Sequence, residues 1–221
     1  MIQIQSVICN VVQPHHWGAM NHVRLLVVLC GVALAHTASA QTLTGEALVR
    51  ALQHGGYVLV MRHASSPREA PDVKTADAGN VTRERQLDEK GRATATSMGA
   101  ALRALKIPIG DVLVSPTYRA RETARLAQLP DPRPQPELGD GGQSMQGISP
   151  EQTRWLKEKT SVFPEGTNAV LITHAPNMTA AFPQWTSSLS DGETIVLGPD
   201  GKGGTTLVAR IKIEDWSQLT K

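Results

Sequence analysis

The chain has few cysteines, little net charge and, beyond residue 41, few histidines, and each shortage narrows the range of functions. Its two cysteines, Cys9 and Cys30, both precede residue 41, so the rest of the chain can form no disulfide. The formal net charge is +2, and there is no basic stripe of the kind that indicates a nucleic acid partner. The histidines that follow residue 41 are His54, His63 and His174.

An apolar run over residues 25–35 is too short for a membrane span, which needs about 20 apolar residues. The run follows Arg24 and leads to the small-residue pattern Ala38-Ser39-Ala40, an arrangement typical of a secretory signal peptide. Met20 stands where such a signal should begin. The pattern predicts cleavage after Ala40, no stable membrane anchor, and a periplasmic or secreted mature protein.

The sequence is therefore expected to divide into a leader, residues 1–40, and one domain over residues 41–221, which is long enough to bury a core. Apolar strand-like runs alternate with helix-like segments along this domain. This alternation predicts an α/β fold with a mostly parallel central sheet, helices on both faces and an antiparallel pair of strands at one edge. The predicted strands cover residues 57–62, 111–114, 135–138, 169–173, 194–197 and 205–213. Three predicted helices begin after the capping residues Thr44, Asp88 and Ser115, and a fourth covers residues 150–162. Residues 64–86 are predicted to form a long loop that faces the substrate.

Three short strings place a histidine or an arginine just beyond an apolar run. They are Val60-Met61-Arg62-His63, Ser115-Pro116-Thr117-Tyr118-Arg119-Ala120 and Ile172-Thr173-His174. Side chains beyond the carboxyl ends of parallel strands converge on one crevice. Two arginines and two histidines in one crevice indicate an anion as the ligand.

A phosphomonoester is the anion that these residue types suit best. Guanidinium groups bind phosphate oxygens bidentately and stay protonated, which predicts that Arg62 and Arg119 hold the ester. The same two positive charges disfavour protonation of a histidine between them, so His63 is expected to be a neutral nucleophile. Attack would produce a phosphohistidine, with His174 stabilising the transition state.

The same residues resemble the histidine phosphatase superfamily, also called the phosphoglycerate mutase-like family. The resemblance spans about residues 57–197 and rests on Arg62-His63, on Ser115-Pro116-x-x-Arg119-Ala120-x-x-Thr123-Ala124, and on Thr173-His174. It implies a phosphorylated His63, a phosphate pocket made of Arg62, Arg119 and His174, and no metal or other cofactor. The segment around Arg85 resembles the family's approach to its first long helix, which implies a mainly structural role, though Arg85 could face the substrate.

Two departures from the family pattern bear on the chemistry. Ala64 stands where the family usually has glycine, and Ala175 stands where the acid-phosphatase branch carries an aspartate after its second histidine. Three residues are therefore candidates for the general acid. Asp140 and Glu137 rank level because they lie where the mutase-like branch places an acidic residue, and Glu193 ranks below them.

These observations predict an exported phosphomonoesterase that acts on a small phosphorylated substrate. Export and the resemblance to exported relatives suggest an envelope phosphosugar, such as a heptose phosphate of the lipopolysaccharide core. Two alternatives stay open: a broad-specificity periplasmic acid phosphatase, and a degenerate module that binds a phosphate ligand without turnover. The oligomeric state is left open.

Overall fold

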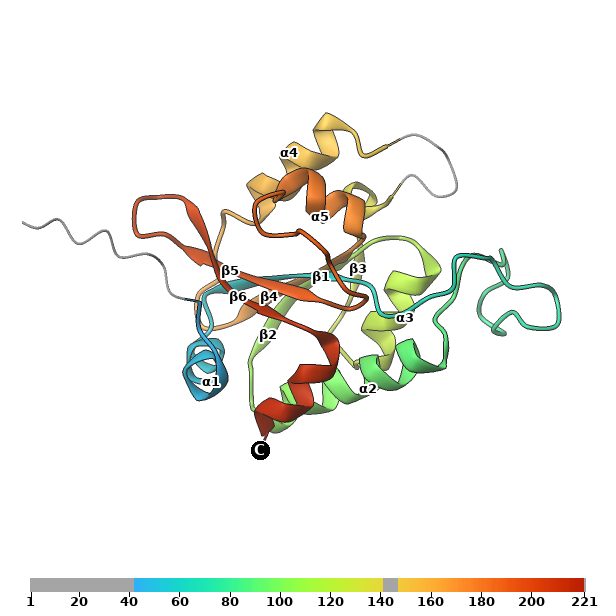
Figure 1. The fold of residues 1–221 in the computed structure, drawn as a ribbon, viewed down its shortest axis with the longest axis horizontal. Helices are drawn as coiled ribbons and strands as arrows, with labels where there is room; N and C mark the ends of the chain where they lie inside the picture. The colour runs from blue at the N-terminus through green and yellow to red at the C-terminus, as the bar shows by residue number, and fades with distance from the viewer. Residues whose placement is uncertain (1–41, 141–146, 221) are drawn as a thin grey trace, which may run out of the picture. The chain divides into compact units, whose positions relative to one another are not determined.

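The computed structural model describes residues 42–140 and 147–220, so the expected leader and its cleavage site lie outside the described residues. Six strands form one sheet in the order β3-β2-β4-β1-β5-β6 (Figure 1). Their bounds are β1 Tyr57–Arg62, β2 Ile109–Val114, β3 Arg133–Pro134, β4 Asn168–Thr173, β5 Thr194–Pro199 and β6 Thr205–Ile211.

The sheet is mostly parallel, as predicted. Strand β4 pairs in parallel with both β1 and β2, and β2 pairs in parallel with β3. Strands β5 and β6 are antiparallel, and β5 joins them to β1. The apolar runs therefore become central strands, and the final pair forms one edge.

Both faces of the sheet are covered because the central strands bury alternate side chains on opposite sides. In β1, Leu59 and Met61 pack with α1, α2, α3 and η2, whereas Val58 and Val60 pack with η1, α4 and α5. The helices are α1 Gly45–His54, α2 Glu89–Ala104, α3 Tyr118–Leu126, α4 Pro150–Lys159 and α5 Ala175–Ala181, with 3-10 helices η1 Pro136–Leu138 and η2 Ile213–Thr220. No helix in residues 42–140 or 147–220 is long and apolar enough to cross a membrane.

The strand predicted at 135–138 is wrong. Strand β3 ends at Pro134, and residues 136–138 form the 3-10 helix η1. Pro136 lacks the N–H group that a strand ladder requires, and it stands at the start of this helical turn. The sequence analysis also missed two elements: the short helix α5, which directly follows β4, and the C-terminal helix η2.

The loop predicted at 64–86 is present as a segment without helix or strand between β1 and α2. Its end is fixed by Asp88, the predicted cap, whose Oδ1 accepts a hydrogen bond from the backbone N–H of Gly91 at 2.7 Å. A Cβ atom at Gly91 would lie 2.1 Å from the carbonyl oxygen of Ser65. Glycine at this position therefore lets α2 approach the chain that follows β1.

Candidate active site

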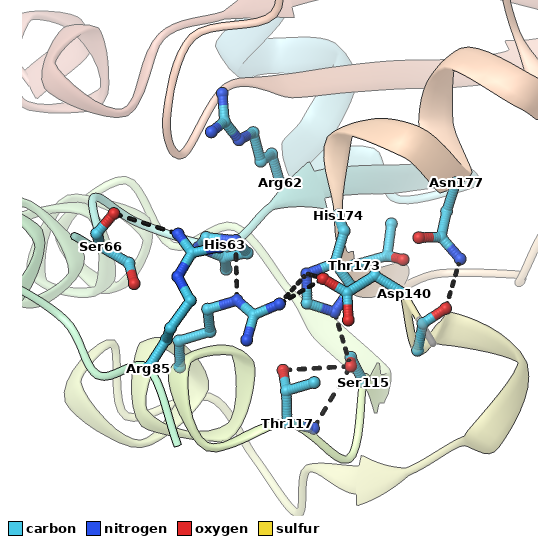
Figure 2. A network of polar contacts seen from close by, with 12 residues as sticks. Arg62, His63, Ser66, Arg85, Ser115, Thr117, Asp140, Thr173, His174 and Asn177 are labelled. Carbon is cyan, nitrogen blue, oxygen red and sulfur yellow. Dashed lines mark hydrogen bonds and ion pairs between the residues drawn. The ribbon is translucent and has the colours of Figure 1, made fainter. Parts of the chain in front are cut away.

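The three sequence strings meet at one edge of the sheet because β1, β2 and β4 are adjacent and parallel. In the strand register, Arg62 lies beside Thr173, and Val114 lies beside Ile172. The residues that follow these strands, including His63, Ser115 and His174, therefore lie together (Figure 2).

The imidazole of His63 is buried and oriented by its neighbours. Its Nδ1 lies 2.8 Å from the carbonyl oxygen of Ala64, and Nε of Arg119 donates to its Nε2 at 3.2 Å. A carbonyl oxygen only accepts and a guanidinium only donates, so Nδ1 carries the hydrogen and Nε2 carries the lone pair. Burial lowers the pKa of His63 well below its usual value, aided by electrostatic interaction with His174, Arg119 and Arg62, and the hydrogen bond to Ala64 opposes this only in part. The ring is thus neutral and presents its lone pair toward Arg119.

His174 is the second buried imidazole, and its ring centroid lies 5.1 Å from that of His63. Its Nε2 lies 2.8 Å from Oγ of Ser115, and its Nδ1 lies 3.1 Å from Nη2 of Arg119. Burial lowers the pKa of His174 to about 2, aided by the positive charges of Arg119, Arg85 and Arg62. Both imidazoles are therefore neutral, and the positive charge of the site comes from its guanidinium groups.

Arg119 connects the members of the site. It lies in the first turn of α3 and is 5% exposed. Its Nε contacts His63, and its Nη2 contacts both His174 and the carboxylate of Asp140. One guanidinium group therefore spans the two imidazoles and a carboxylate, and it offers several N–H donors to an anion.

The structure does not bring Arg62 into this hydrogen-bond network. Its Nη1 donates to the carbonyl oxygen of Leu189 at 3.0 Å, its Nη2 lies 2.5 Å from Oδ1 of Asp191, and Figure 2 shows the side chain extending away from His63. Its charge still acts on both imidazoles, as the pKa directions show. The predicted phosphate-binding role of Arg62 therefore remains a prediction.

Arg85 is placed beside the site by the long loop. Its Nε and Nη2 donate to the carbonyl oxygens of Pro67 and Ser66 at 2.6 and 3.2 Å. Burial and the neighbouring charge of Arg119 lower the pKa of Arg85. The side chain thus ties the loop together and also adds positive charge near His174.

The three candidates for the general acid lie in different surroundings. Oδ2 of Asp140 contacts Arg119 and lies 3.3 Å from Nδ1 of His174. Glu137 instead pairs with the side chain of Gln135, and Glu193 is held by Arg210, whose Nε lies 2.7 Å from its Oε1. Among the described contacts, Asp140 is the candidate carboxylate that joins the imidazole and guanidinium cluster.

Several residues position this cluster without being among the predicted site residues. Thr123 accepts a hydrogen bond from the Ala64 N–H at 3.1 Å and donates to the Arg119 carbonyl at 2.8 Å, which ties α3 to the chain beside His63. Thr173 donates to the Leu138 carbonyl at 2.7 Å, and Asn177 donates to the Gly139 carbonyl at 2.9 Å. These two bonds hold the chain that leads into Asp140.

The prediction that Ser115 caps the next helix is wrong. The capping position is Thr117, and α3 begins at Tyr118. The Ser115 hydroxyl instead lies against His174, and it accepts a hydrogen bond from the Thr117 N–H at 3.3 Å. The Ser-Pro motif was the feature of the sequence that could have indicated this contact with His174. A serine just before a helix is, however, expected first to cap that helix.

The described residues contain no group of three or more histidine, cysteine, aspartate or glutamate side chains that could hold a metal ion. No metal or other cofactor was predicted for this chain.

Comparison with known proteins relates the part of the chain that carries His63, Arg119 and Asp140 to one family. A sequence model of the histidine phosphatase superfamily, branch 1, matches residues 58–154. The structure of the protein histidine phosphatase SixA complexed with tungstate is similar in fold, with a TM-score of 0.52, 21% sequence identity, and coverage of 71% of this chain and 97% of that chain. A phosphoserine phosphatase from Entamoeba histolytica in complex with phosphoserine aligns with a TM-score of 0.48, 9% identity and coverage of 72% and 98%. No curated protein matches the sequence.

Proposed function

Because the chain belongs to the histidine phosphatase superfamily, whose members are phosphatases, we propose that it is a metal-independent, exported phosphomonoesterase with His63 as its nucleophile. The observation that carries the proposal is the hydrogen-bond pattern of His63. The Ala64 carbonyl holds the hydrogen on Nδ1, so the lone pair is on Nε2, beside the Arg119 guanidinium. A neutral nucleophile next to a fixed cation suits attack on a phosphate ester.

In the first proposed step, phosphoryl oxygens accept the hydrogen bonds of Arg119, replacing both the Asp140 carboxylate and Nε2 of His63 as its acceptors, which frees the Nε2 lone pair. The His63 lone pair attacks phosphorus, and the bond from phosphorus to the ester oxygen breaks. The acid form of Asp140 gives its proton to that oxygen, and the alcohol leaves. Asp140 suits this role because it lies beside both Arg119 and His174.

In the second proposed step, water attacks the phosphohistidine. The Asp140 carboxylate takes a proton from the water, the phosphorus–nitrogen bond breaks, and inorganic phosphate leaves. His63 returns to its neutral form with the hydrogen still on Nδ1. Arg119 stabilises the charge on the phosphoryl oxygens in both steps, and His174, whose Nδ1 accepts from Nη2 of Arg119, holds that guanidinium in place.

The proposed location and substrate rest on the sequence. The signal-peptide pattern before residue 41 supports export, and an exported phosphatase would meet phosphosugars of the cell envelope, such as a heptose phosphate of the lipopolysaccharide core. The cluster of buried imidazoles and guanidinium groups supports a phosphate ester but selects no particular sugar.

Hydrolysis of p-nitrophenyl phosphate by the full chain in EDTA tests the proposal. We expect turnover in the presence of the chelator, its loss in His63→Ala, and its retention in the matched control His54→Ala, which removes an exposed imidazole on α1. Absence of turnover in the unsubstituted chain, with vanadate still bound, would reject the phosphatase and indicate the degenerate binding module. Turnover that survives His63→Ala would reject His63 as the nucleophile.

A further inference from the structure

A cavity of about 560 Å³ opens beside Arg119 and Asp140, and most of its lining comes from the long loop that follows β1. Three further arginines line it: Arg68, Arg83 and Arg85. A phosphoryl group bonded to His63 would occupy only the end of this cavity at Arg119. The remainder is available to the other part of a substrate.

Positive side chains outnumber negative ones in the lining of this cavity. Four arginines and two carboxylates, Glu84 and Asp140, line it. Both carboxylates already have partners, since Asp140 pairs with Arg119 and Glu84 accepts from the backbone N–H of Tyr118. A phosphoryl group at Arg119 would therefore leave Arg68 and Arg83 without an anionic partner.

These two arginines are separate from the imidazole cluster. Among the described contacts, neither hydrogen-bonds His63 or His174, whose side-chain partners are Arg119, Ser115 and Asp140. Both are exposed, and neither side chain has a hydrogen-bond or ion-pair partner among the described residues. Glu84, next to Arg83, is already engaged, because its Oε2 accepts from the backbone N–H of Tyr118 at 2.9 Å.

The backbone at Arg83 is held in an unfavourable conformation. Its φ is 53°, in the left-handed region that costs free energy for any residue with a Cβ atom. Asn80, which is 2% exposed, maintains this turn: its carbonyl accepts from the Arg83 N–H at 2.9 Å, and its side chain bonds both the N–H and the carbonyl of Glu84, at 2.9 and 2.6 Å. Strain of this kind persists where surrounding structure fixes it, and it is concentrated at ligand-binding positions.

We propose that this cavity binds a second anionic group of the substrate, with Arg83 as its main ligand and Arg68 beside it. The preferred substrate is then a phosphomonoester that carries a further phosphate or carboxylate on the same molecule. The inference rests on the proposed function, since the phosphoryl group on His63 fixes the other end of the substrate. Arg83 is a specificity-determining residue in this scheme and takes no part in bond breaking.

Phosphate release from three sugars tests the inference in the full chain: glucose 6-phosphate, glucose 1,6-bisphosphate and 6-phosphogluconate. Because a hydrogen bond to a charged group contributes about tenfold or more, we expect kcat/KM to be at least tenfold higher for a substrate with a second anion. A preference for the bisphosphate would identify phosphate as that group, and a preference for phosphogluconate would identify carboxylate. Arg83→Gln should remove the preference, whereas Arg121→Gln, which deletes an exposed arginine of α3 that lines a different cavity, should keep it.

Binding to His63→Ala separates this inference from the proposed function, because it needs no turnover. Calorimetry should give at least tenfold tighter binding of a sugar with two anionic groups than of glucose 6-phosphate, and His63→Ala/Arg83→Gln should lose the difference. Equal affinities in His63→Ala, or a difference that survives Arg83→Gln, would overturn the inference even if p-nitrophenyl phosphate is hydrolysed. Discrimination in this assay without hydrolysis of p-nitrophenyl phosphate would support the second anion site and reject the phosphatase.

Discussion

The two buried imidazoles should make the folded protein sensitive to mild acid. The pKa of His174 falls from a usual value of 6.5 to about 2 on folding, chiefly through burial. Below pH 6.5 the unfolded chain binds a proton at this residue and the folded chain does not. The free energy of unfolding therefore falls as pH falls from 6.5 toward 2, by about 1.4 kcal/mol per pH unit for this one residue. His63 shifts in the same direction and adds to the effect.

The magnitude can be isolated with one substitution. Between pH 8 and pH 4.5, His174 alone should lower the free energy of unfolding by about 2.7 kcal/mol, since the unfolded pKa lies two units above the lower pH. His174→Gln removes the titrating ring, so the loss between these two pH values should shrink by that amount, whatever the substitution does to stability at pH 8.

Urea unfolding of the full chain at both pH values, in buffers without phosphate, measures this difference. His54→Gln is the matched control because it removes an exposed histidine of α1. The reasoning is refuted if His174→Gln and the unsubstituted chain lose the same free energy of unfolding between pH 8 and pH 4.5.

Three further predictions concern individual side chains of the site. Arg119→Lys should lower kcat/KM for p-nitrophenyl phosphate by roughly 10² to 10³, because an ammonium group cannot reach both imidazoles and a phosphoryl group at once; a loss below tenfold would contradict its bridging role. Asp140→Asn should slow release of the alcohol in the first turnover far more for an alkyl phosphate than for p-nitrophenyl phosphate, whose leaving group needs no proton, while Glu137→Gln should change neither; equal slowing of this first step on both substrates, measured by rapid-quench kinetics, would argue against Asp140 as the acid. Ser115→Ala should lower the free energy of unfolding by about 1–3 kcal/mol at pH 8, because it leaves Nε2 of His174 buried without this hydrogen-bond partner. Urea unfolding of the variant at pH 8 measures this loss, and a free energy of unfolding equal to that of the unsubstituted chain would contradict the prediction.

Much of the fold could be predicted because its central strands are unambiguous. Strand β1 has the predicted bounds, and β4 begins one residue before the predicted start, since both are continuous apolar runs buried on two faces. The two-residue strand β3 lacks such a run, and the seven-residue helix α5 is too short to show a helical period.

The meeting of His63, Arg119 and His174 was also predictable, because parallel strands carry the residues that follow them to a common edge. The candidate carboxylate that contacts Arg119 could not be predicted, because Glu137 and Asp140 lie only three residues apart and a 3-10 turn decides which of them reaches Arg119. The orientation of the Arg62 side chain could not be predicted either, because its ion-pair partner Asp191 lies far away along the chain.

Under the two proposals made above, Glu84 links substrate recognition to the chemical step. Its carboxylate lies at the N-terminus of α3, against the N–H of Tyr118, one residue before Arg119. It also follows Arg83 directly in the strained turn. A change in this loop that displaces Glu84 would therefore loosen the first turn of α3 and the guanidinium that it carries. New substrate preferences could arise here by exchanging side chains on a preserved turn, whereas insertions or deletions between residues 80 and 84 would alter specificity and turnover together.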